Sequence, residues 1–545
     1  MTVSQLLEAY ARSQQTRLHS NKARAVKSLP KSSGYVSIPY WGLLALPAAA
    51  GLGAWWSNAQ LSKHAPHSQR YRPRYADKAT MLRAANEIVI VVGKDAVSFD
   101  GDIIESHGYS DWSTSNSAGR PVAVVYPRTT EEVSRIAEIC NKHNVPIVPF
   151  GAGSSVEGNF SSPHSGICLD FTMMDRVLAF HPDDMDVIVQ PGVNWVDLNN
   201  KIKGDGLFLP LDPSPTATIG GMVSTNCSGT NAFRYGTMKD WVISVTVVLA
   251  DGQVIKTRKR PRKTSAGYNL TSLFVGAEGT LGVVTEITMK LAVILPDTSV
   301  AVVSFPTIKD AASAATKLIR SGIQLAALEL MDEVQMQVVN RHGSEAVRKT
   351  KWDEKPTLFL KFSGTADGIK GDVSRVQKIV KPYAPMSIFF ARTKQEETDL
   401  WSARKEALWT MTSIKPEGYS IWSTDVAVPI SRLAEIIELS KEDSGNLGLF
   451  ASVVGHVGDG NFHQAVFYET DNKAQEQSVS DCVHKMMQRA LEMEGTVSGE
   501  HAIGIGKKEC LVDELGNDTI QLMKTLKHAV DPKWLMNPGK VFDFL

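Results

Sequence analysis

Pro146-Ile-Val-Pro-Phe-Gly-Ala-Gly-Ser-Ser-Val-Glu-Gly158 joins a short apolar run to a loop of glycine and serine. The apolar run 146–150 predicts a buried strand. A strand that leads into such a loop gathers backbone N–H groups in a concavity that can hold a pyrophosphate. The loop is neither GxGxxG, because position 156 is Val, nor a Walker A loop. By itself it is equally compatible with a plain turn.

The segments before this loop predict alternating strands and helices from about residue 85 onward. Residues 122–126 (Val-Ala-Val-Val-Tyr) are typical of a buried strand. The following Pro127-Arg-Thr-Thr-Glu-Glu begins a helix with acidic residues in its first turn, and this helix ends near Asn144. The loop at 151–158 therefore closes a strand–helix–strand unit.

Two further loops rich in small residues lie beside β-branched strands. One runs from Pro213 to Asn231 and precedes the predicted strand 242–249, which Asp251-Gly252 would turn into a hairpin. The other is Phe274-Val-Gly-Ala-Glu-Gly-Thr-Leu-Gly-Val-Val-Thr-Glu-Ile287. Three such loops suit a long, extended ligand that contacts the backbone along its length. A purely structural explanation needs three glycine clusters without a ligand.

The residues best suited to metal binding and acid–base catalysis lie near the C-terminus, in His456-Val-Gly-Asp-Gly-Asn-Phe-His463 and Ser498-Gly-Glu-His501. Two imidazoles and a carboxylate can bind a divalent metal and leave one histidine free as a base. The spacing of His456 and His463 is not the i, i+4 spacing of a helical zinc motif. The alternative is two glycine turns with solvent-facing histidines.

Composition narrows the possible cofactors. The 545 residues carry 58 basic and 58 acidic side chains, so net charge gives no indication of a nucleic-acid partner. The five scattered cysteines form no CxxC, CxxCH or iron–sulfur spacing. Any redox cofactor here would therefore have to be bound without a cysteine motif.

The N-terminus is unlike the rest of the chain. Residues 1–34 are basic, serine-containing and nearly free of acids, which is typical of a mitochondrial transit peptide. Residues 35–57 hold no charge and carry tryptophans near both ends, which predicts a transmembrane anchor, with 58–84 as a linker. A cleaved sorting signal or a buried hairpin are the alternatives, since Pro39 and Pro47 weaken a helix.

Taken together, these motifs resemble a known family. The segments 149–159, 219–229 and 276–287 are similar to the FAD-binding domain of the vanillyl-alcohol oxidase/p-cresol methylhydroxylase (PCMH) type. The C-terminal motifs, with Asn537-Pro-Gly-Lys540, resemble its D-2-hydroxyacid dehydrogenase branch. The resemblance implies an α+β fold with a two-subdomain FAD-binding domain at 85–295. It also implies a substrate cap at 296–495 and a segment 496–545 that returns to the FAD domain.

In the cap, strands are expected at 357–362 and 421–428 and helices at 311–319 and 430–439, forming an antiparallel sheet that helices cover on one side. The resemblance also implies which residues bind FAD. The expected set comprises Pro149, Phe150, Gly151, Ala152, Gly153, Ser154, Ser155, Gly158, Pro213, Thr218, Ile219, Gly220, Gly221, Ser224, Thr225, Asn226, Cys227, Gly229, Tyr235, Glu278, Gly279, Thr280, Leu281, Gly282, Val283, Val284 and Ile287. The first loop has no histidine, whereas some relatives attach the flavin to one there, so the FAD is expected to be non-covalent.

By the same resemblance, His456, His463 and Glu500 would bind a divalent metal, Zn²⁺ or Mn²⁺, and His501 would be the general base. Arg404 would hold the substrate carboxylate, and Asn461 would complete the substrate contacts; without the family, Arg404 would be read as a solvated helix residue.

The implied reaction is oxidation of D-lactate to pyruvate, with hydride transfer to FAD and cytochrome c as electron acceptor. The enzyme would be held at the mitochondrial inner membrane and face the intermembrane space. D-2-hydroxyglutarate and glycolate are alternative substrates, although Ser423-Thr424 offers no lysine for a second carboxylate. A flavin-dependent synthase without an external acceptor, and a tethered binding protein, are alternatives of other classes.

Overall fold

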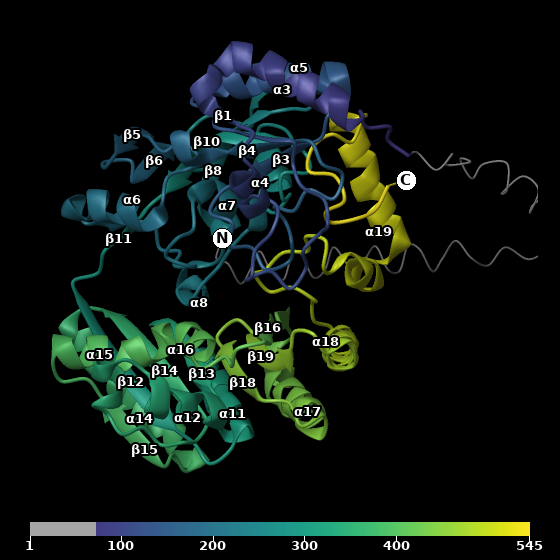
Figure 1. Cartoon of the computed structure of the whole chain (residues 1–545). Helices are drawn as coiled ribbons and strands as arrows, with labels where there is room; N and C mark the ends of the chain where they lie inside the picture. Colours follow the sequence, from purple (N-terminus) through teal and green to yellow (C-terminus); the bar gives the residue numbers. More distant parts are fainter. Residues whose placement is uncertain (1–71, 545) are drawn as a thin grey trace, which may run out of the picture. The chain divides into compact units, whose positions relative to one another are not determined.

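A computed structural model describes residues 72–544 (Figure 1). The predicted transit peptide, the predicted anchor at 35–57 and residues 58–71 of the predicted linker lie outside the described residues. Within residues 72–544, no helix has both the length and the hydropathy needed to cross a membrane.

The prediction of a linker at 58–84 is wrong for residues 78–84, because helix α3 spans Lys78–Val92. The Asp77 side chain caps its first turn by accepting a hydrogen bond from the Thr80 N–H at 2.8 Å. Met81, Ala84 and Ile88 follow at helical spacing and are buried in the first core. Residues 78–84 therefore belong to the folded domain.

The first sheet leads into the glycine–serine loop at 151–158. Its strands β1 (Val97–Ser98), β2 (Ala123–Val125), β4 (Ile167–Asp170) and β3 (Ile147–Phe150) lie in the order β1-β2-β4-β3. Strands β2, β4 and β3 are parallel. Helix α5 (Thr130–His143) connects β2 to β3 and ends at Asn144, whose φ of 55° allows the chain to turn. The predicted strands at 122–126 and 146–150 and the helix between them are confirmed.

The second sheet has five antiparallel strands in the order β5-β6-β10-β8-β9. They are β5 (Val177–His181), β6 (Asp186–Val189), β10 (Val283–Lys290), β8 (Val242–Val248) and β9 (Val254–Lys256). The turn predicted at Asp251-Gly252 joins β8 to β9, which confirms that hairpin. Helix α7 (Ile219–Thr225) packs against this sheet through Ile219, Met222 and Val223.

Shorter elements complete this part of the chain. They are α4 (Gly101–Ser106), α6 (Trp195–Ile202), β7 (Leu207–Phe208), α8 (Ala232–Tyr235), α9 (Met238–Trp241), α10 (Leu270–Phe274) and β11 (Ala292–Val293). Short 3₁₀ turns occur at Lys94–Ala96, Phe171–Met173, Lys203–Asp205, Lys381–Tyr383 and Ile430–Arg432.

The third sheet forms the cap and is antiparallel throughout. Its order is β15-β12-β14-β13-β18-β19-β16, and β17 pairs with β19. The strands are β12 (Asp297–Ser304), β13 (Leu325–Met331), β14 (Thr357–Gly364), β15 (Ser387–Phe390), β16 (Tyr419–Ser423), β17 (Val426–Ala427), β18 (Ala451–His456) and β19 (Asn461–Glu469). The cap helices are α11 (Ile308–Arg320), α12 (Glu333–His342), α13 (Glu345–Arg348), α14 (Ala366–Val380), α15 (Lys394–Lys405), α16 (Ala407–Ser413), α17 (Leu433–Asn446) and α18 (Lys473–Glu492).

Helices lie on both faces of the cap sheet, so the expectation of a sheet covered on one side is wrong. Helices α11, α14, α17 and α18 share one core with residues such as Leu328 and Leu360. The alternate residues Ala327 and Phe359 face α12, α15 and α16. Strand residues alternate between faces, and both sets here are apolar at this end of the sheet, so both need cover.

The C-terminal segment returns to the first two sheets (Figure 1). Met536 forms a parallel bridge with Ile147 of β3, the strand that leads into the loop at 151–158. In helix α19 (Lys508–Val530), the buried Lys527 ammonium donates to the carbonyls of Thr280 at 2.6 Å and Met536 at 2.8 Å. It also pairs with Asp531. Lys527 thus joins three separate chain segments.

We expect Lys527→Met to lower the free energy of unfolding by about 3–5 kcal/mol, because the change leaves Asp531 buried without its counter-charge. Thermal unfolding followed by circular dichroism measures the loss. Lys524→Met, at a partly exposed position of the same helix, is the matched control and should cost far less. Equal melting temperatures for the two variants would show that the buried pair contributes little.

Candidate functional site

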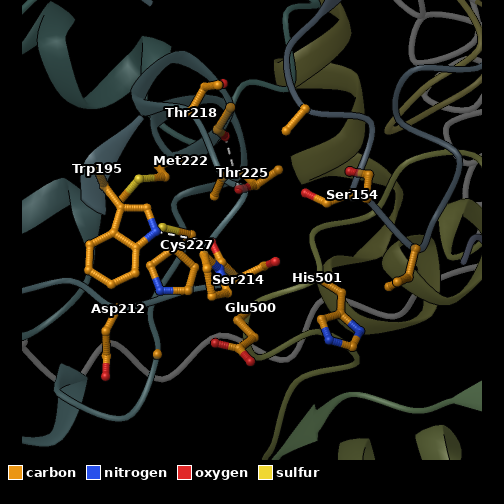
Figure 2. A pocket seen from close by; sticks show the side chains of 18 of the residues that line it. Ser154, Trp195, Asp212, Ser214, Thr218, Met222, Thr225, Cys227, Glu500 and His501 are labelled. Carbon is orange, nitrogen blue, oxygen red and sulfur yellow. Dashed lines mark hydrogen bonds between the residues drawn. The ribbon is translucent and has the colours of Figure 1, made fainter. Parts of the chain in front are cut away.

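A cavity of about 1020 Å³ lies between the first two sheets and the cap, and all three small-residue loops reach it. Figure 2 shows Glu500 and His501 among its lining side chains, with Ser154, Thr218 and Cys227 from the loops. The expected FAD-binding residues that line it are Pro149, Phe150, Gly151, Ala152, Gly153, Ser154, Ser155, Pro213, Thr218, Gly220, Gly221, Ser224, Thr225, Cys227, Gly229, Glu278, Gly279, Gly282 and Val284.

The other expected FAD-binding residues do not line this cavity: Gly158, Ile219, Asn226, Tyr235, Thr280, Leu281, Val283 and Ile287. Several of them support the loops instead. Ile219 and Ile287 are core residues of the second sheet, and the Asn226 side-chain Oδ1 accepts a hydrogen bond from the Thr237 hydroxyl at 3.1 Å. Sequence motifs do not separate residues that contact a ligand from those that shape the loop.

The loop geometry suits a ligand that approaches the backbone. A Cβ atom placed on Gly151 would come within 2.7 Å of the Thr218 hydroxyl oxygen, so the two segments nearly touch. That hydroxyl is buried and has no hydrogen-bond partner. An orphaned polar atom on the cavity wall is a position where a bound group can supply the missing partner. The residues present therefore fit FAD.

The His456–His463 motif is a β-hairpin. His456 ends β18, and His463 lies in β19 opposite Val454. Because residues two apart in a strand share a face, His456 and His463 project from the same face of the sheet, toward the cavity. A spacing of seven residues thus brings the two imidazoles together, and the reading as solvent-facing turns is wrong.

Glu500 comes from the C-terminal segment and meets both histidines. Its Oε1 lies 3.4 Å from His456 Nε2 and 3.1 Å from His463 Nε2. Donor atoms arranged tetrahedrally around zinc, at about 2.0–2.1 Å from it, are about 3.3 Å apart. His463 Nε2 is buried and makes no hydrogen bond. The three donors therefore fit a divalent metal.

A second layer of contacts orients each donor. His456 Nδ1 lies 3.0 Å from Glu329 Oε1, and His463 Nδ1 lies 2.9 Å from the Thr424 carbonyl. With Nδ1–H donating outward, each Nε2 lone pair faces Glu500. The Ser228 hydroxyl donates to Glu500 Oε2 at 2.5 Å, so the segment that carries Glu500 is tied to one of the small-residue loops.

The titration behaviour of this cluster follows from its charges. Burial alone would lower the pKa of His456, but Glu329 and Glu500 outweigh burial and raise it well above its usual range. Burial would raise the pKa of Glu500, but the two histidines reverse the direction and hold it well below its usual range. The cluster favours positive charge between its carboxylates.

His501 stacks on His463, with ring centroids 4.9 Å apart and an interplanar angle of 17°. Burial, more than any neighbouring charge, lowers the pKa of His501 to about 4. The imidazole is therefore neutral near pH 7. Its Nδ1 is buried without a hydrogen-bond partner. A neutral ring that faces the cavity and has an unused nitrogen has the properties of a general base.

Arg404 lines the cavity and is not a solvated helix residue. Its Nη2 lies 2.7 Å from Glu329 Oε2 and its Nε 2.9 Å from the same oxygen. Glu329 thus bridges Arg404 and His456. The remaining guanidinium N–H groups can donate to one carboxylate.

Asn461 does not line the cavity, in contrast to the expectation of a substrate contact. Its amide donates to Asp425 Oδ1 at 2.8 Å and to the Val426 carbonyl at 2.9 Å. Both amide hydrogens are therefore used within the cap. Asn461 positions Asp425 instead.

Asp425, Glu329 and Ser228 are functional neighbours that the motifs did not reveal. Asp425 Oδ2 accepts the backbone N–H groups of Glu500 at 2.9 Å and His501 at 2.8 Å. Glu329 is the single charged residue in the buried strand β13, and that isolation was its only signal. Asp425 and Ser228 carried no comparable signal in the sequence.

Two acids of the FAD-binding part hold the segment that follows His501. Glu278 accepts the N–H groups of Ile503 at 2.9 Å and Gly504 at 2.8 Å. The carbonyl of Glu157 accepts the Ile505 N–H at 2.8 Å, and its carboxylate lies 3.3 Å from Lys507 Nζ. The catalytic-site candidates are thus fixed to the FAD-binding loops as well as to the cap.

Comparisons with known proteins agree with this architecture. Residues 121–258 match the model for the FAD binding domain, and residues 294–541 match that for the C-terminal domain of FAD linked oxidases. The D-lactate dehydrogenase (cytochrome) of Kluyveromyces lactis mitochondria is 43% identical over 86% of this chain and 83% of its own length. The Saccharomyces cerevisiae D-lactate dehydrogenase (cytochrome) 1 is 46% identical over 78% and 73%, respectively. The chain belongs to this family of FAD linked oxidases.

Solved structures show that this FAD linked oxidase has the PCMH-type α+β fold. The 4-ethylphenol oxidase of Gulosibacter chungangensis gives a TM-score of 0.72 at 18% identity and covers 87% of this chain and 99% of that one. p-Cresol methylhydroxylase gives 0.68 at 17% identity, over 86% and 98%. At this identity the likeness concerns the fold alone.

The environment of Glu157 predicts a pH dependence of stability in this oxidase. Burial raises the pKa of Glu157 to about 7, although Lys507 opposes the rise. The folded state therefore binds more protons than the unfolded state between about pH 4.5 and 7, and this group destabilises the fold as pH rises through that window. The loss is on the order of 3 kcal/mol.

We expect Glu157→Gln, which cannot ionise, to flatten the fall in melting temperature between pH 5 and pH 7.5, each about half a unit from an end of the window. Glu131→Gln, at an exposed position of α5, is the control and should follow the unmodified protein. Parallel pH profiles for all three proteins would contradict the assignment.

Proposed function

We propose that the chain is a mitochondrial D-lactate dehydrogenase that oxidises D-lactate to pyruvate with FAD and passes the electrons to cytochrome c. The observation that carries the proposal is the meeting of His456, His463, Glu500 and His501 at a cavity lined by the FAD-binding loops. The relatives' names support the substrate, the acceptor and the organelle.

Bound along the three loops, FAD would supply a two-electron acceptor. The first loop, 151–155, contains only Gly, Ala and Ser, so it has no side chain of the kind that holds a flavin covalently in some relatives. We propose that the FAD is non-covalent. Thr218 and the backbone of Gly151 are the contacts that the geometry supports best.

His456, His463 and Glu500 would hold a divalent ion, Zn²⁺ or Mn²⁺, which when bound lowers the pKa of a substrate hydroxyl. Arg404 would orient the substrate by binding its carboxylate in a bidentate manner. His501 would then take the hydroxyl proton, because it is neutral near pH 7. Asn461 acts only through Asp425.

Among the alternatives, D-2-hydroxyglutarate needs a cation for its second carboxylate. The cavity residue at the end of β16 is Ser423, and Thr424 follows it, so this strand supplies none. A synthase without an external acceptor has no need of three metal donors beside a general base. We favour a monocarboxylate substrate and an oxidation.

For location, we propose that residues 1–34 direct import and that residues 35–57 anchor the enzyme in the inner membrane, with the catalytic part in the intermembrane space. The basic composition of the first segment and the uncharged second segment support this. Carbonate extraction of mitochondria, followed by protease treatment of mitoplasts, tests both points.

The function is tested with the purified, flavin-loaded protein. Reduction of dichlorophenol-indophenol should be rapid with D-lactate and negligible with L-lactate, since the Arg404 and His501 contacts fix one enantiomer. Glycolate and D-2-hydroxyglutarate should give lower kcat/KM values. A preparation without a flavin spectrum, or one with no preference for the D form, would reject the proposal.

Removal of one metal donor should abolish metal retention. We expect His463→Ala to be isolated nearly metal-free and Glu329→Gln to bind the ion about 10–100-fold more weakly, because Glu329 orients His456 from outside the donor set. Chelator competition and elemental analysis measure both. His484→Ala, an exposed histidine of α18, is the control. Unchanged metal content in His463→Ala would refute the donor set.

Loss of the base should slow chemistry without loss of either cofactor. We expect His501→Gln to retain FAD and metal but to reduce the flavin about 10²–10⁴-fold more slowly in a single turnover with D-lactate. Stopped-flow bleaching of the flavin measures the rate. A rate equal to that of the unmodified enzyme would assign the proton transfer to another group.

A further inference from the structure

Two exposed tryptophans meet at the mouth of the cavity. The rings of Trp112, from the loop after α4, and Trp409, from α16 of the cap, have centroids 5.4 Å apart in an edge-to-face arrangement. Trp112 is 42% exposed and Trp409 53% exposed, although Trp409 also lines the cavity. Leu408 and Tyr109 beside them are similarly exposed. Exposed aromatic residues at a cavity mouth are typical of an interaction site rather than of a solvated surface.

An acidic hollow lies on the cap beside α16, the helix that carries Trp409. It holds about 610 Å³ and is lined on the cap by Glu417, Glu469 and Asp471, among others. Tyr419, which lines the hollow, packs in one apolar cluster with Met411 of α16. The hollow and Trp409 therefore lie on cap elements that pack against each other.

The cations nearby do not neutralise these acids. Arg120 is bonded to Glu105 at 2.7 Å, and Lys473 to Glu476 at 2.7 Å. Lys405 and Lys415 are exposed on either side of α16. Glu417, Glu469 and Asp471 have no ion pair within 4.0 Å among the described residues. They are joined by Asp111, which lies between Tyr109 and Trp112 in the same loop.

The whole catalytic part is acidic as well. Residues 1–71 contain eight of the 58 basic and one of the 58 acidic side chains, so residues 72–545 contain 50 basic and 57 acidic ones. A basic partner would be attracted to this part over long range and then guided to the local acidic surface.

We propose that a small basic haem protein, the electron acceptor, docks at a surface with two parts. One part is formed by Tyr109, Trp112, Leu408 and Trp409, and the other is the hollow lined by Glu417, Glu469 and Asp471. The proposal rests on the proposed function. Oxidation of one D-lactate to pyruvate releases two electrons and two protons, and two ferric haem proteins are reduced in succession at this surface, each by one electron. The protons pass to solvent.

The chemistry of the surface matches what such an encounter requires. Electron-transfer complexes bury small interfaces and exchange quickly, so a few aromatic anchors with a charged rim suffice. Opposite charge on the rim increases the association rate more than the affinity. The position at the cavity mouth also places the acceptor at the opening of the cavity that the FAD-binding loops line.

The test compares two electron acceptors with the full, flavin-loaded enzyme. We expect Trp112→Ala to lower kcat/KM for ferricytochrome c about tenfold, because an anchor is lost. D-lactate-dependent reduction of dichlorophenol-indophenol, a small dye that needs no docking surface, should be unchanged. Trp112 lines neither the cavity nor the metal donor set.

A second variant, Glu417→Lys with Asp471→Lys, tests charge without touching the aromatic residues. It should lower kcat/KM for ferricytochrome c about tenfold at low ionic strength and much less at high ionic strength. Glu345→Lys with Asp367→Lys, at exposed cap positions elsewhere, is the matched control.

The outcomes separate the two proposals. Absence of dye reduction in the unmodified enzyme would reject the proposed function itself. Normal dye reduction, with cytochrome reduction unaffected by both the tryptophan and the charge variants, would overturn the docking surface alone. Equal losses in the control pair would attribute the effect to net charge and would also overturn the local site.

Discussion

The buried carboxylate of Asp425 is the constraint on which the site depends. It accepts hydrogen bonds from the Asn461 amide of the cap, and from the Ser498 hydroxyl and the Glu500 and His501 N–H groups of the C-terminal segment. Burial would raise the pKa of Asp425, but His501 and Lys507 outweigh burial and hold it below its usual range. An ionised, fully bonded carboxylate fixes the Glu500–His501 backbone to the hairpin that carries His456 and His463. Loss of this anchor would free the Glu500–His501 backbone from the hairpin, while strand pairing would still hold His456 and His463 together.

The site also depends on contacts that cross from the cap to the FAD-binding loops. Glu278 adopts a φ of 52° in its glycine-rich loop and directs its carboxylate to the Ile503 and Gly504 N–H groups. Ser228 reaches Glu500 from another of the loops. A flavin held by these loops and a substrate held by the cap would therefore share one rigid support. Rigid support of both reactants is what hydride transfer requires.

The sequence predicted the parts with local signals and missed those without. Strand–loop–helix boundaries around residues 122–150 were predictable, because apolar runs, an acidic first turn and glycine loops are local features. The seven-residue spacing of His456 and His463 is also a local feature, because a four-residue turn between paired strands places both histidines on one face of a hairpin. Glu329 and Asp425 could not be predicted as partners, since each acts on residues about 75 or more positions away. The start of helix α3 at Lys78 was missed, because the domain boundary was placed at residue 85 from the strands and loops that follow.

Glu329 explains why a metal and a substrate carboxylate suit the same site. Its two oxygens face Arg404 and His456, and Glu500 adds a second negative charge. With neutral histidines and no ion, the two carboxylates and one guanidinium give a net charge of about −1, which repels an organic anion. The high pKa of His456 shows that the cluster takes up positive charge, and a proton there gives only neutrality. A divalent ion in place of that proton gives about +1, which matches one carboxylate. The charges of these three groups thus favour a divalent ion beside a substrate carboxylate.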